Sequence, residues 1–316
     1  MPKFTGFPSA FRNIGAIRNQ GLELTLNTIN YKNANFSWET NFNITFNQNK
    51  VLALSDGEGN RLETISWNQS FINSPLYITE LGQPAGQFLG FIWEGNYQYN
   101  DFDQTSPGVY KLKPGVADNG NTTVQPGDIK YKDINGDGTV NDLDRTIIGR
   151  GTPIHTGGFS NIFRYKNFDL NVFLQWSYGN DLVNANKLMF EGTSLNLLNQ
   201  FATYVDRWTP ENQNNEHYRT NGYGPLGRYS TKIIEDGSYL RLKTVSVGYR
   251  IPNKILSKYK LKGLSITAAA QNLLTFTKYS GFDPEVSTRN SVLTPGFDYS
   301  AYPQARTVVF GINATF

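Results

Sequence analysis

The sequence lacks cysteine entirely and has only two histidines among its 316 residues. The absence of cysteine excludes disulfide bonds, thiol nucleophiles and cysteine-ligated metals. His155 and His217 lie far apart in the chain and show no carboxylate–histidine spacing typical of a zinc site. Catalytic-triad motifs and phosphate-binding glycine loops in a strand-to-helix context are also missing. The sequence therefore indicates a protein that is not an enzyme.

Long apolar runs and concentrated charge are missing as well. No stretch approaches the roughly 18 consecutive apolar residues of a spanning helix, so any membrane crossing must use strands. The net charge is +3, from 29 basic and 26 acidic side chains dispersed along the chain. Without a basic stripe, we expect no nucleic-acid partner. The first seven residues also lack a secretory signal, which leaves a leaderless cytosolic protein as one alternative.

What the chain does have is alternation of apolar and polar residues in several segments. Clear examples are 36–46, 168–177 and the last segment, 306–316. Strands of about ten residues with one apolar face and one polar face are typical of membrane β-barrels with a wet lumen. We predict that the apolar set faces lipid: Trp38, Phe42, Leu170, Trp176, Phe310 and Phe316. We predict that the polar set faces the lumen: Glu39, Asn41, Asn43, Asp169, Asn171 and Gln175.

Alternation and turn residues together predict an all-β chain of about nine antiparallel strands. Short and long connections alternate between them, as the periplasmic turns and extracellular loops of outer-membrane barrels do. The predicted strands are 15–29, 36–47, 71–81, 87–97, 157–165, 168–178, 238–251, 261–276 and 304–316. Bacterial barrels have an even strand number and no open edges, so we expect residues 1–316 to be part of a larger transmembrane barrel. Signal peptide, plug and earlier strands would then precede Met1.

The longest connections are 98–156, which carries an Asp-rich turn, and 180–237. Apolar residues at loosely helical spacing predict a short helix or two within the second of these. Loops this long are uncommon in compact soluble domains and favour functional surface segments. A secreted β-sandwich adhesin or carbohydrate-binding module, with ordinary aromatic packing between two sheets, is the alternative interpretation.

Several stretches resemble the SusC/RagA family of TonB-linked outer-membrane proteins. They are 13–24, 36–47, 127–138, 144–149, 168–175, 236–243 and 270–274, in the order of that family's carboxy-terminal portion. The resemblance implies a barrel of about 22 strands closed by a plug. It further implies import of oligosaccharides or peptides across the outer membrane, a SusD-like lipoprotein at the extracellular mouth, and TonB acting through the missing amino-terminal part.

One loop carries a candidate metal site. Its oxygen-bearing side chains and glycine stand at the spacing of a Ca²⁺-binding loop, although the last acid is Asp where Glu is usual and no helix pattern flanks it. The candidate ligands are Asp133, Asn135, Asp137, Thr139, Asn141 and Asp144. We hypothesise that Ca²⁺ orders this loop; the alternative is a cluster of Asx turns that needs no metal.

Overall fold

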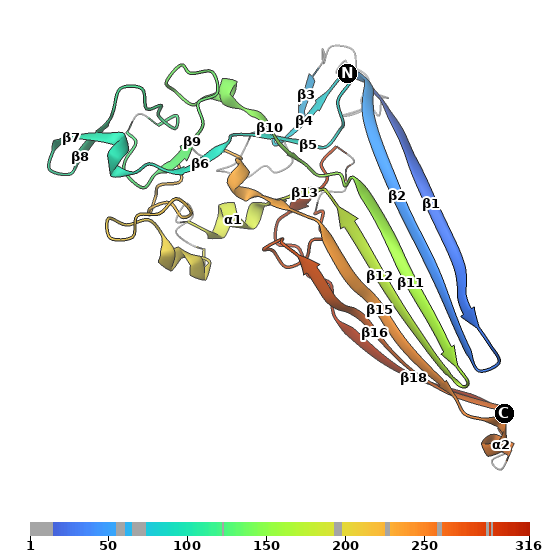
Figure 1. The fold of residues 1–316 in the computed structure, drawn as a ribbon. Helices are drawn as coiled ribbons and strands as arrows, with labels where there is room; N and C mark the ends of the chain where they lie inside the picture. The colour runs from blue at the N-terminus through green and yellow to red at the C-terminus, as the bar shows by residue number, and fades with distance from the viewer. Residues whose placement is uncertain are drawn as a thin grey trace, which may run out of the picture.

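The computed structural model describes residues 15–54, 61–64, 74–121, 123–192, 198–224, 228–257, 261–288, 291 and 293–316. It has two parts, a long antiparallel sheet and a folded group of connections at one end of that sheet (Figure 1). We call the sheet the wall and the folded connections the loop assembly. The tight turns of the wall and the carboxy-terminus lie at the opposite end of the sheet from the loop assembly (Figure 1).

The wall is one seven-stranded sheet whose neighbouring strands are all antiparallel and follow one another in chain order. A tilted strand of roughly 9 to 11 residues crosses a bilayer, and every wall strand reaches that length. The predicted antiparallel barrel wall is confirmed. The wall strands are β1 (Gly15–Lys32), β2 (Phe36–Leu54), β11 (His155–Tyr165), β12 (Phe168–Tyr178), β15 (Tyr239–Arg250), β16 (Gly263–Thr277) and β18 (Thr307–Thr315).

Two of the nine predicted wall strands, 71–81 and 87–97, lie in the loop assembly instead; residues 71–73 are outside the described residues. The physical reason is their pattern of burial. Leu76, Tyr77 and Ile78 are consecutive and all buried, as are Phe88 and Leu89. A strand buried on both faces needs cover on both sides, which a barrel wall does not provide. The two segments are adjacent in sequence, so their removal leaves the alternation of short and long connections intact.

The loop assembly contains four small sheets and a few short helices. β3 (Arg61–Thr64), β4 (Tyr77–Glu80), β5 (Gln87–Gly90) and β10 (Thr146–Arg150) form a four-stranded sheet. β13 (Asp181–Asn184) lies between β14 (Ile234–Asp236) and β17 (Phe297–Asp298) in a three-stranded sheet. The two-stranded sheets pair β6 (Trp93–Asn96) with β9 (Ile129–Tyr131) and β7 (Phe102–Ser106) with β8 (Val109–Leu112).

Helices are few and short. Within the predicted helical segment, the structure has α1 (Ala185–Phe190) and the 3-10 helix η4 (Ala202–Asp206), and residues 193–197 between them lie outside the described residues. The other helices within the described residues are η2 (Tyr99–Asp101), η3 (Asp142–Asp144), η5 (Thr231–Ile233) and α2 (Asn253–Leu256). In the described part of the chain, no helix combines the length and the hydropathy needed to cross a bilayer.

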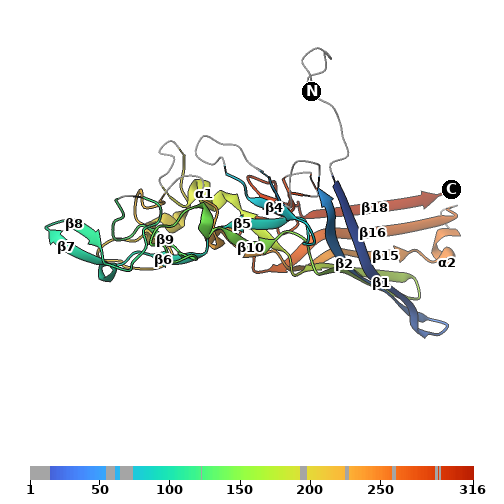
Figure 2. The ribbon, with the colours of Figure 1, turned by 90° about the horizontal axis from the view of Figure 1, so that it is seen from above.

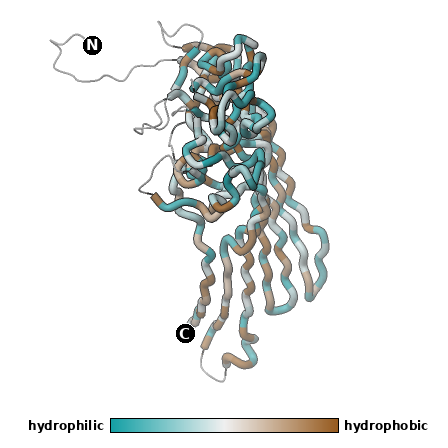
Figure 3. Tube along the Cα trace, turned by 90° about the vertical axis from the view of Figure 1, so that its left-hand side faces the viewer, coloured by the Kyte–Doolittle hydropathy of each residue, from teal (hydrophilic) through white to brown (hydrophobic). Residues whose placement is uncertain are grey.

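The register of the wall brings the alternating patterns of all seven strands into phase. One row across the sheet joins Tyr31, Trp38, Phe163, Leu170, Val247, Ala268 and Phe310. The adjacent row joins Lys32, Ser37, Arg164, Asp169, Gly248, Thr267 and Gly311. Directly opposed residues share a face, so one face of the wall is apolar and the other polar. The alternation of brown and teal along the strands is visible in Figure 3.

The main buried core is formed by residues of the loop assembly. The loop assembly itself lies at one end of the wall strands (Figure 2). It draws on all three long connections of the chain: Tyr77, Phe88 and Tyr131 come from the first, Tyr218 from the second and Phe297 from the third. A second, smaller cluster forms around Tyr97, Phe102 and Val124. The three long connections therefore pack together into one unit.

Candidate functional site

The predicted lumen-facing residues share the polar face of the wall. Gly158 of β11 is opposed by Asn43 on one side and Gln175 on the other. On the same face, Arg164 Nη1 lies 2.5 Å from Glu39 Oε1, and Ser160 Oγ donates to Asn171 Oδ1 at 2.9 Å. Asn41 and Asp169 belong to the same set. The structure brings these six residues together on one face, and their assignment to a lumen stays a prediction.

The predicted lipid-facing residues share the opposite face. Trp38 stacks on Phe163 with ring centroids 5.7 Å apart, and Phe42 stacks on Trp176 at 5.9 Å. Leu170 and Phe310 lie in the apolar row described above, and Phe316 follows β18 at the same two-residue spacing. Phe310 is 79% exposed and Phe316 is 80% exposed. These side chains form an apolar surface, and its contact with lipid stays a prediction.

This exposed surface does not fit the β-sandwich alternative. In a sandwich, the apolar faces of two sheets pack against each other and bury their side chains. Leu24 and Leu26 in β1 are instead 55% and 53% exposed, and Val308 in β18 is 59% exposed. In the described part of the chain, no second sheet covers these apolar side chains.

The Asp-rich turn is a tightly hydrogen-bonded loop. Asp133 accepts hydrogen bonds from the backbone N–H groups of Gly136 (2.7 Å) and Gly138 (2.8 Å). Both glycines have positive φ, which glycine adopts readily. Asp144 is fully buried and accepts from the N–H groups of Ile134 (2.8 Å) and Asn141 (2.8 Å).

The remaining candidate ligands are hydrogen-bonded within the same loop. Asn135 Oδ1 accepts from the N–H of Asp137, Asp137 Oδ1 from that of Thr139, and Asn141 Oδ1 from that of Leu143. The Thr139 N–H and the Asn135 amide lower the pKa of Asp137. This is the geometry of the Asx-turn alternative. In the parts of the chain that the structure describes, no group of three or more acidic or histidine side chains is placed to hold a metal. Ca²⁺ binding stays a prediction.

The loop assembly contains a cavity of about 790 Å³. Its walls come from α1, from the segment around η4 and from the connection between β16 and β18. Four aromatic side chains line it, and two of them are strongly exposed: Phe282 at 82% and Tyr302 at 97%. The other two are Phe190 and Phe201, whose ring centroids lie 5.6 Å apart. A volume of roughly 300–1,000 Å³ with apolar lining and a few polar groups is typical of a ligand site.

The charged groups around this cavity are paired with each other. Lys187 Nζ lies 2.9 Å from Glu235 Oε1, and Lys232 Nζ lies 3.1 Å from Glu191 Oε2. Burial lowers the pKa of Lys232, with Glu191 opposing that shift. Burial raises the pKa of Glu235, but hydrogen bonds from the Ser280 backbone and Lys187 outweigh it, so this pKa lies below its usual value. The pairing neutralises the charge next to the cavity.

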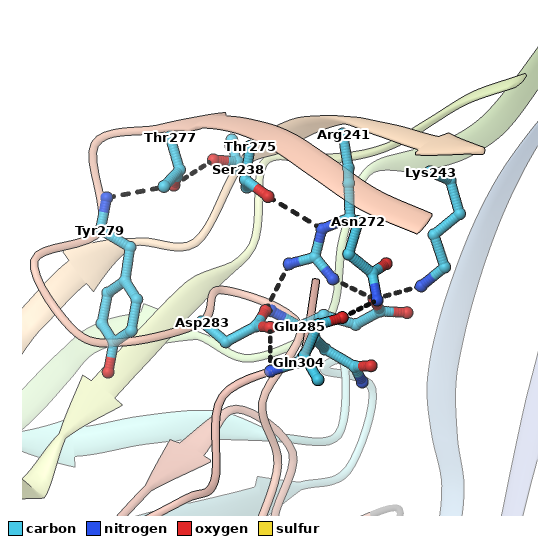
Figure 4. A network of polar contacts seen from close by, with 11 residues as sticks. Ser238, Arg241, Lys243, Asn272, Thr275, Thr277, Tyr279, Asp283, Glu285 and Gln304 are labelled. Atoms are coloured by element: carbon cyan, nitrogen blue, oxygen red, sulfur yellow. Dashed lines mark hydrogen bonds and ion pairs between the residues drawn. The ribbon is translucent and has the colours of Figure 1, made fainter. Parts of the chain in front are cut away.

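Beside the cavity, a polar network joins the wall to the third long connection (Figure 4). Arg241 of β15 is 1% exposed and contacts Asp283 (2.5 Å), Glu285 (2.9 Å) and Thr275 Oγ1 (3.0 Å). Lys243 Nζ lies 3.1 Å from the same Glu285 oxygen that Arg241 contacts. We call these five residues the Arg241 network. It ties the polar face of the wall to the loop assembly.

The cavity and the Arg241 network were not predicted from the sequence. The sequence does contain a signal for the network. Arg241 and Lys243 are spaced two apart on a strand, and Asp283 and Glu285 are spaced two apart in the connection between β16 and β18. Each pair therefore presents like charges on one side of an extended chain. The sequence did not show that the two pairs meet.

Comparisons with known proteins agree with this geometry. No family model matches the sequence. The whole chain is 36% identical to TonB-dependent receptor P3 and 30% identical to TonB-dependent receptor P26, both of Formosa agariphila, and covers 30% and 31% of their lengths. Over 96% of its length it is 25% identical to TonB-dependent receptor SusC of Bacteroides thetaiotaomicron, covering 27% of that protein. The solved RagAB peptide importer in its closed-closed state superposes on the whole chain with a TM-score of 0.72 at 25% identity, covering 31% of the solved chain.

The fold and its two faces define the class as a wall segment of a membrane β-barrel with its loops. Within that class, the chain is similar over its whole length to TonB-dependent receptors P3 and P26, and over 96% of its length to SusC. The resemblance seen in the sequence motifs is thereby confirmed. The chain spans about 30% of the length of the curated relatives it matches.

Proposed function

We propose that this chain forms the carboxy-terminal part of the barrel of an outer-membrane, TonB-dependent transporter that imports oligosaccharides or peptides. The observation that carries the proposal is the alignment of the apolar and polar positions across neighbouring strands of the wall. Seven strands present one largely apolar face and one largely polar face, as a barrel between lipid and a wet lumen requires. The similarity to TonB-dependent receptors supports it independently.

The proposed partners follow from the same architecture. Outer-membrane lipid would contact the apolar face, and TonB would act through a part of the receptor outside this chain. A SusD-like lipoprotein would sit on the loop assembly, which is a folded unit with its own core at one end of the wall. The fold shared with the RagAB peptide importer supports this arrangement.

The cavity is the proposed cargo contact within this chain. It lies in the loop assembly, it has a ligand-sized volume, and it exposes the rings of Phe282 and Tyr302. Flat rings with nearby hydroxyl and amide groups can contact either sugar rings or peptide side chains. Of the charged residues that line it, Lys187 is paired with Glu235 and Glu191 with Lys232, so this lining favours a cargo without net charge.

The function is tested with the full-length receptor in cells that lack the endogenous copy. We expect it in the outer-membrane fraction, with uptake of labelled oligosaccharides or peptides that stops when TonB is removed. Receptor recovered in the aqueous fraction, or uptake that is independent of TonB, would contradict the proposal. For the cavity, Tyr302→Ala should lower uptake, whereas Leu143→Ala, which changes a side chain that is 74% exposed and lies outside the cavity, should not.

A further inference from the structure

The connection between β16 and β18 supplies two separate pieces of the cavity wall. Residues 280–282 form one piece and residues 300–303 form the other. Phe282 and Tyr302 are the large exposed rings of these two pieces, and we call them the rim rings. Each piece must be fixed in place if the cavity is to keep its shape.

The inner part of each piece is held by residues of the loop assembly itself. The Ser280 N–H and hydroxyl donate to Glu235 at 2.7 and 2.8 Å. The Ser300 N–H donates to Asn186 Oδ1 at 2.9 Å. These contacts hold positions 280 and 300, which precede the two rim rings in the chain. Further contacts follow the rim rings in each limb.

A single carboxylate holds both sides of the rim. Asp283 directly follows Phe282, and its Oδ2 accepts a hydrogen bond from the backbone N–H of Gln304 at 3.1 Å. Gln304 stands two residues after Tyr302, so Asp283 joins the two limbs of the connection next to both rim rings. The other oxygen, Oδ1, accepts from Arg241 Nη2 at 2.5 Å. The joined limbs are thus attached to β15 of the wall (Figure 4).

Arginine is suited to this attachment because its planar guanidinium can donate in several fixed directions at once. Arg241 uses three of them, toward Asp283, Glu285 and Thr275. Asp283 is only 7% exposed, so removing Arg241 would leave a buried carboxylate without its ion-pair partner. We then expect the connection between β16 and β18 to move away from the wall.

We propose that Arg241 is a positioning residue for the cavity: through Asp283, it fixes the rim rings of Phe282 and Tyr302 against the barrel wall. The rim is preformed before cargo arrives, which reduces the ordering cost of binding. Only the identification of the cavity as a cargo contact rests on the proposed function. The position of the rim is a property of the receptor without cargo, so the two ideas fail separately.

The test measures distances across the cavity in the full-length receptor, purified in detergent and made free of any other cysteine. Spin labels are placed at Thr203→Cys together with Phe282→Cys, and in a second protein at Thr203→Cys together with Tyr302→Cys. We expect one narrow distance distribution for each pair. Arg241→Met should abolish the narrow peak in both pairs. Arg241→Lys should restore part of it, because lysine can keep the ion pair with Asp283 but not all three contacts.

Lys243→Met is the matched control, since it removes a cation of the same network that contacts Glu285 and not Asp283. Its distributions should stay narrow. Narrow peaks in Arg241→Met, or equal broadening in Lys243→Met, would overturn the proposal. Heat-modifiable migration on a gel verifies that each barrel is folded. If Arg241→Met does not fold, Asp283→Asn tests the same link, because an amide cannot supply both acceptor oxygens; an unchanged distribution there also overturns it.

Discussion

The wall and the loop assembly place their large apolar side chains in opposite surroundings. In the wall, Leu24 is 55% exposed and Phe310 is 79% exposed, whereas Tyr77, Phe88 and Phe297 in the loop assembly are 0% exposed. The same residue types therefore serve two different purposes. In the loop assembly they exclude water from a packed core, and in the wall they form a surface suited to an apolar medium.

The two regions also differ in how they are held together. Each wall strand pairs with its neighbours in chain order, so its contacts are regular and local to one hairpin or one adjacent strand. The loop assembly brings together three connections that are far apart in sequence. Apart from the link through Arg241, we therefore expect a change in one region to leave the other largely intact. The following experiments use the full-length receptor to test that separation.

The largest effect is expected from Phe88→Ala in the core of the loop assembly. Phe88 is fully buried and packs against Tyr77 with ring centroids 5.3 Å apart. Truncating a buried Phe costs about 3–5 kcal/mol. Hydrogen exchange should show lost protection in the loop assembly with the wall strands still protected. Equal loss in both regions would show that they do not fold as separate units.

The next largest effect on stability is expected from Leu170→Arg, because this change places a charge in the apolar row of the wall. An arginine on the lipid face of a barrel costs about 2–4 kcal/mol at the bilayer midplane and less toward the interfaces, and Leu170 is the third residue of β12. Asn171→Arg is the matched control, since the next residue points to the polar face. Unfolding in lipid vesicles should show destabilisation for the first variant and little for the second. The reverse order would invert the assignment of the two faces.

Calcium should affect only the loop assembly. If the Asp-rich turn binds Ca²⁺, then a concentration of 100 times the Kd stabilises the folded state by about 2.7 kcal/mol. Protease cleavage in residues 133–144 should slow on adding Ca²⁺ and recover with chelator, and Asp133→Asn should abolish the response. An identical cleavage pattern in all three conditions would favour the Asx-turn alternative.

The smallest effect is expected from the pH dependence of the Glu235 contacts. Its pKa in the folded protein lies below the usual value of 4.5. The contribution of Glu235 to the stability of the folded state is therefore complete above pH 4.5. It is lost as the pH falls through the pKa that Glu235 has in the folded protein. Glu235→Gln should remove about 1 kcal/mol of stability at neutral pH and reduce this acid dependence. If the loop assembly of the mutant unfolds at the same acidic pH as that of the parent receptor, Glu235 does not contribute to the acid dependence of stability.

The wall was predictable because its signal is local. Alternation between Phe36 and Phe46, or between Phe168 and Trp176, is visible in ten residues and directly gives the two faces. The register then confirmed that these faces align across strands. The two segments wrongly placed in the wall, 71–81 and 87–97, show the limit of that signal. An apolar run without alternation does not reveal what covers it.

The sequence by itself determined the antiparallel wall with its apolar and polar faces. It also determined the alternation of short and long connections and the family resemblance. Each of these features depends on residues that are close together in the sequence. Only the tertiary structure decided that the long connections share one core, that they enclose a cavity and that Arg241 meets Asp283. These contacts join residues such as Tyr77 and Pro295, whose side-chain hydroxyl and backbone carbonyl lie 2.7 Å apart. Which distant segments meet depends on the packing of the whole assembly, and no local pattern encodes it.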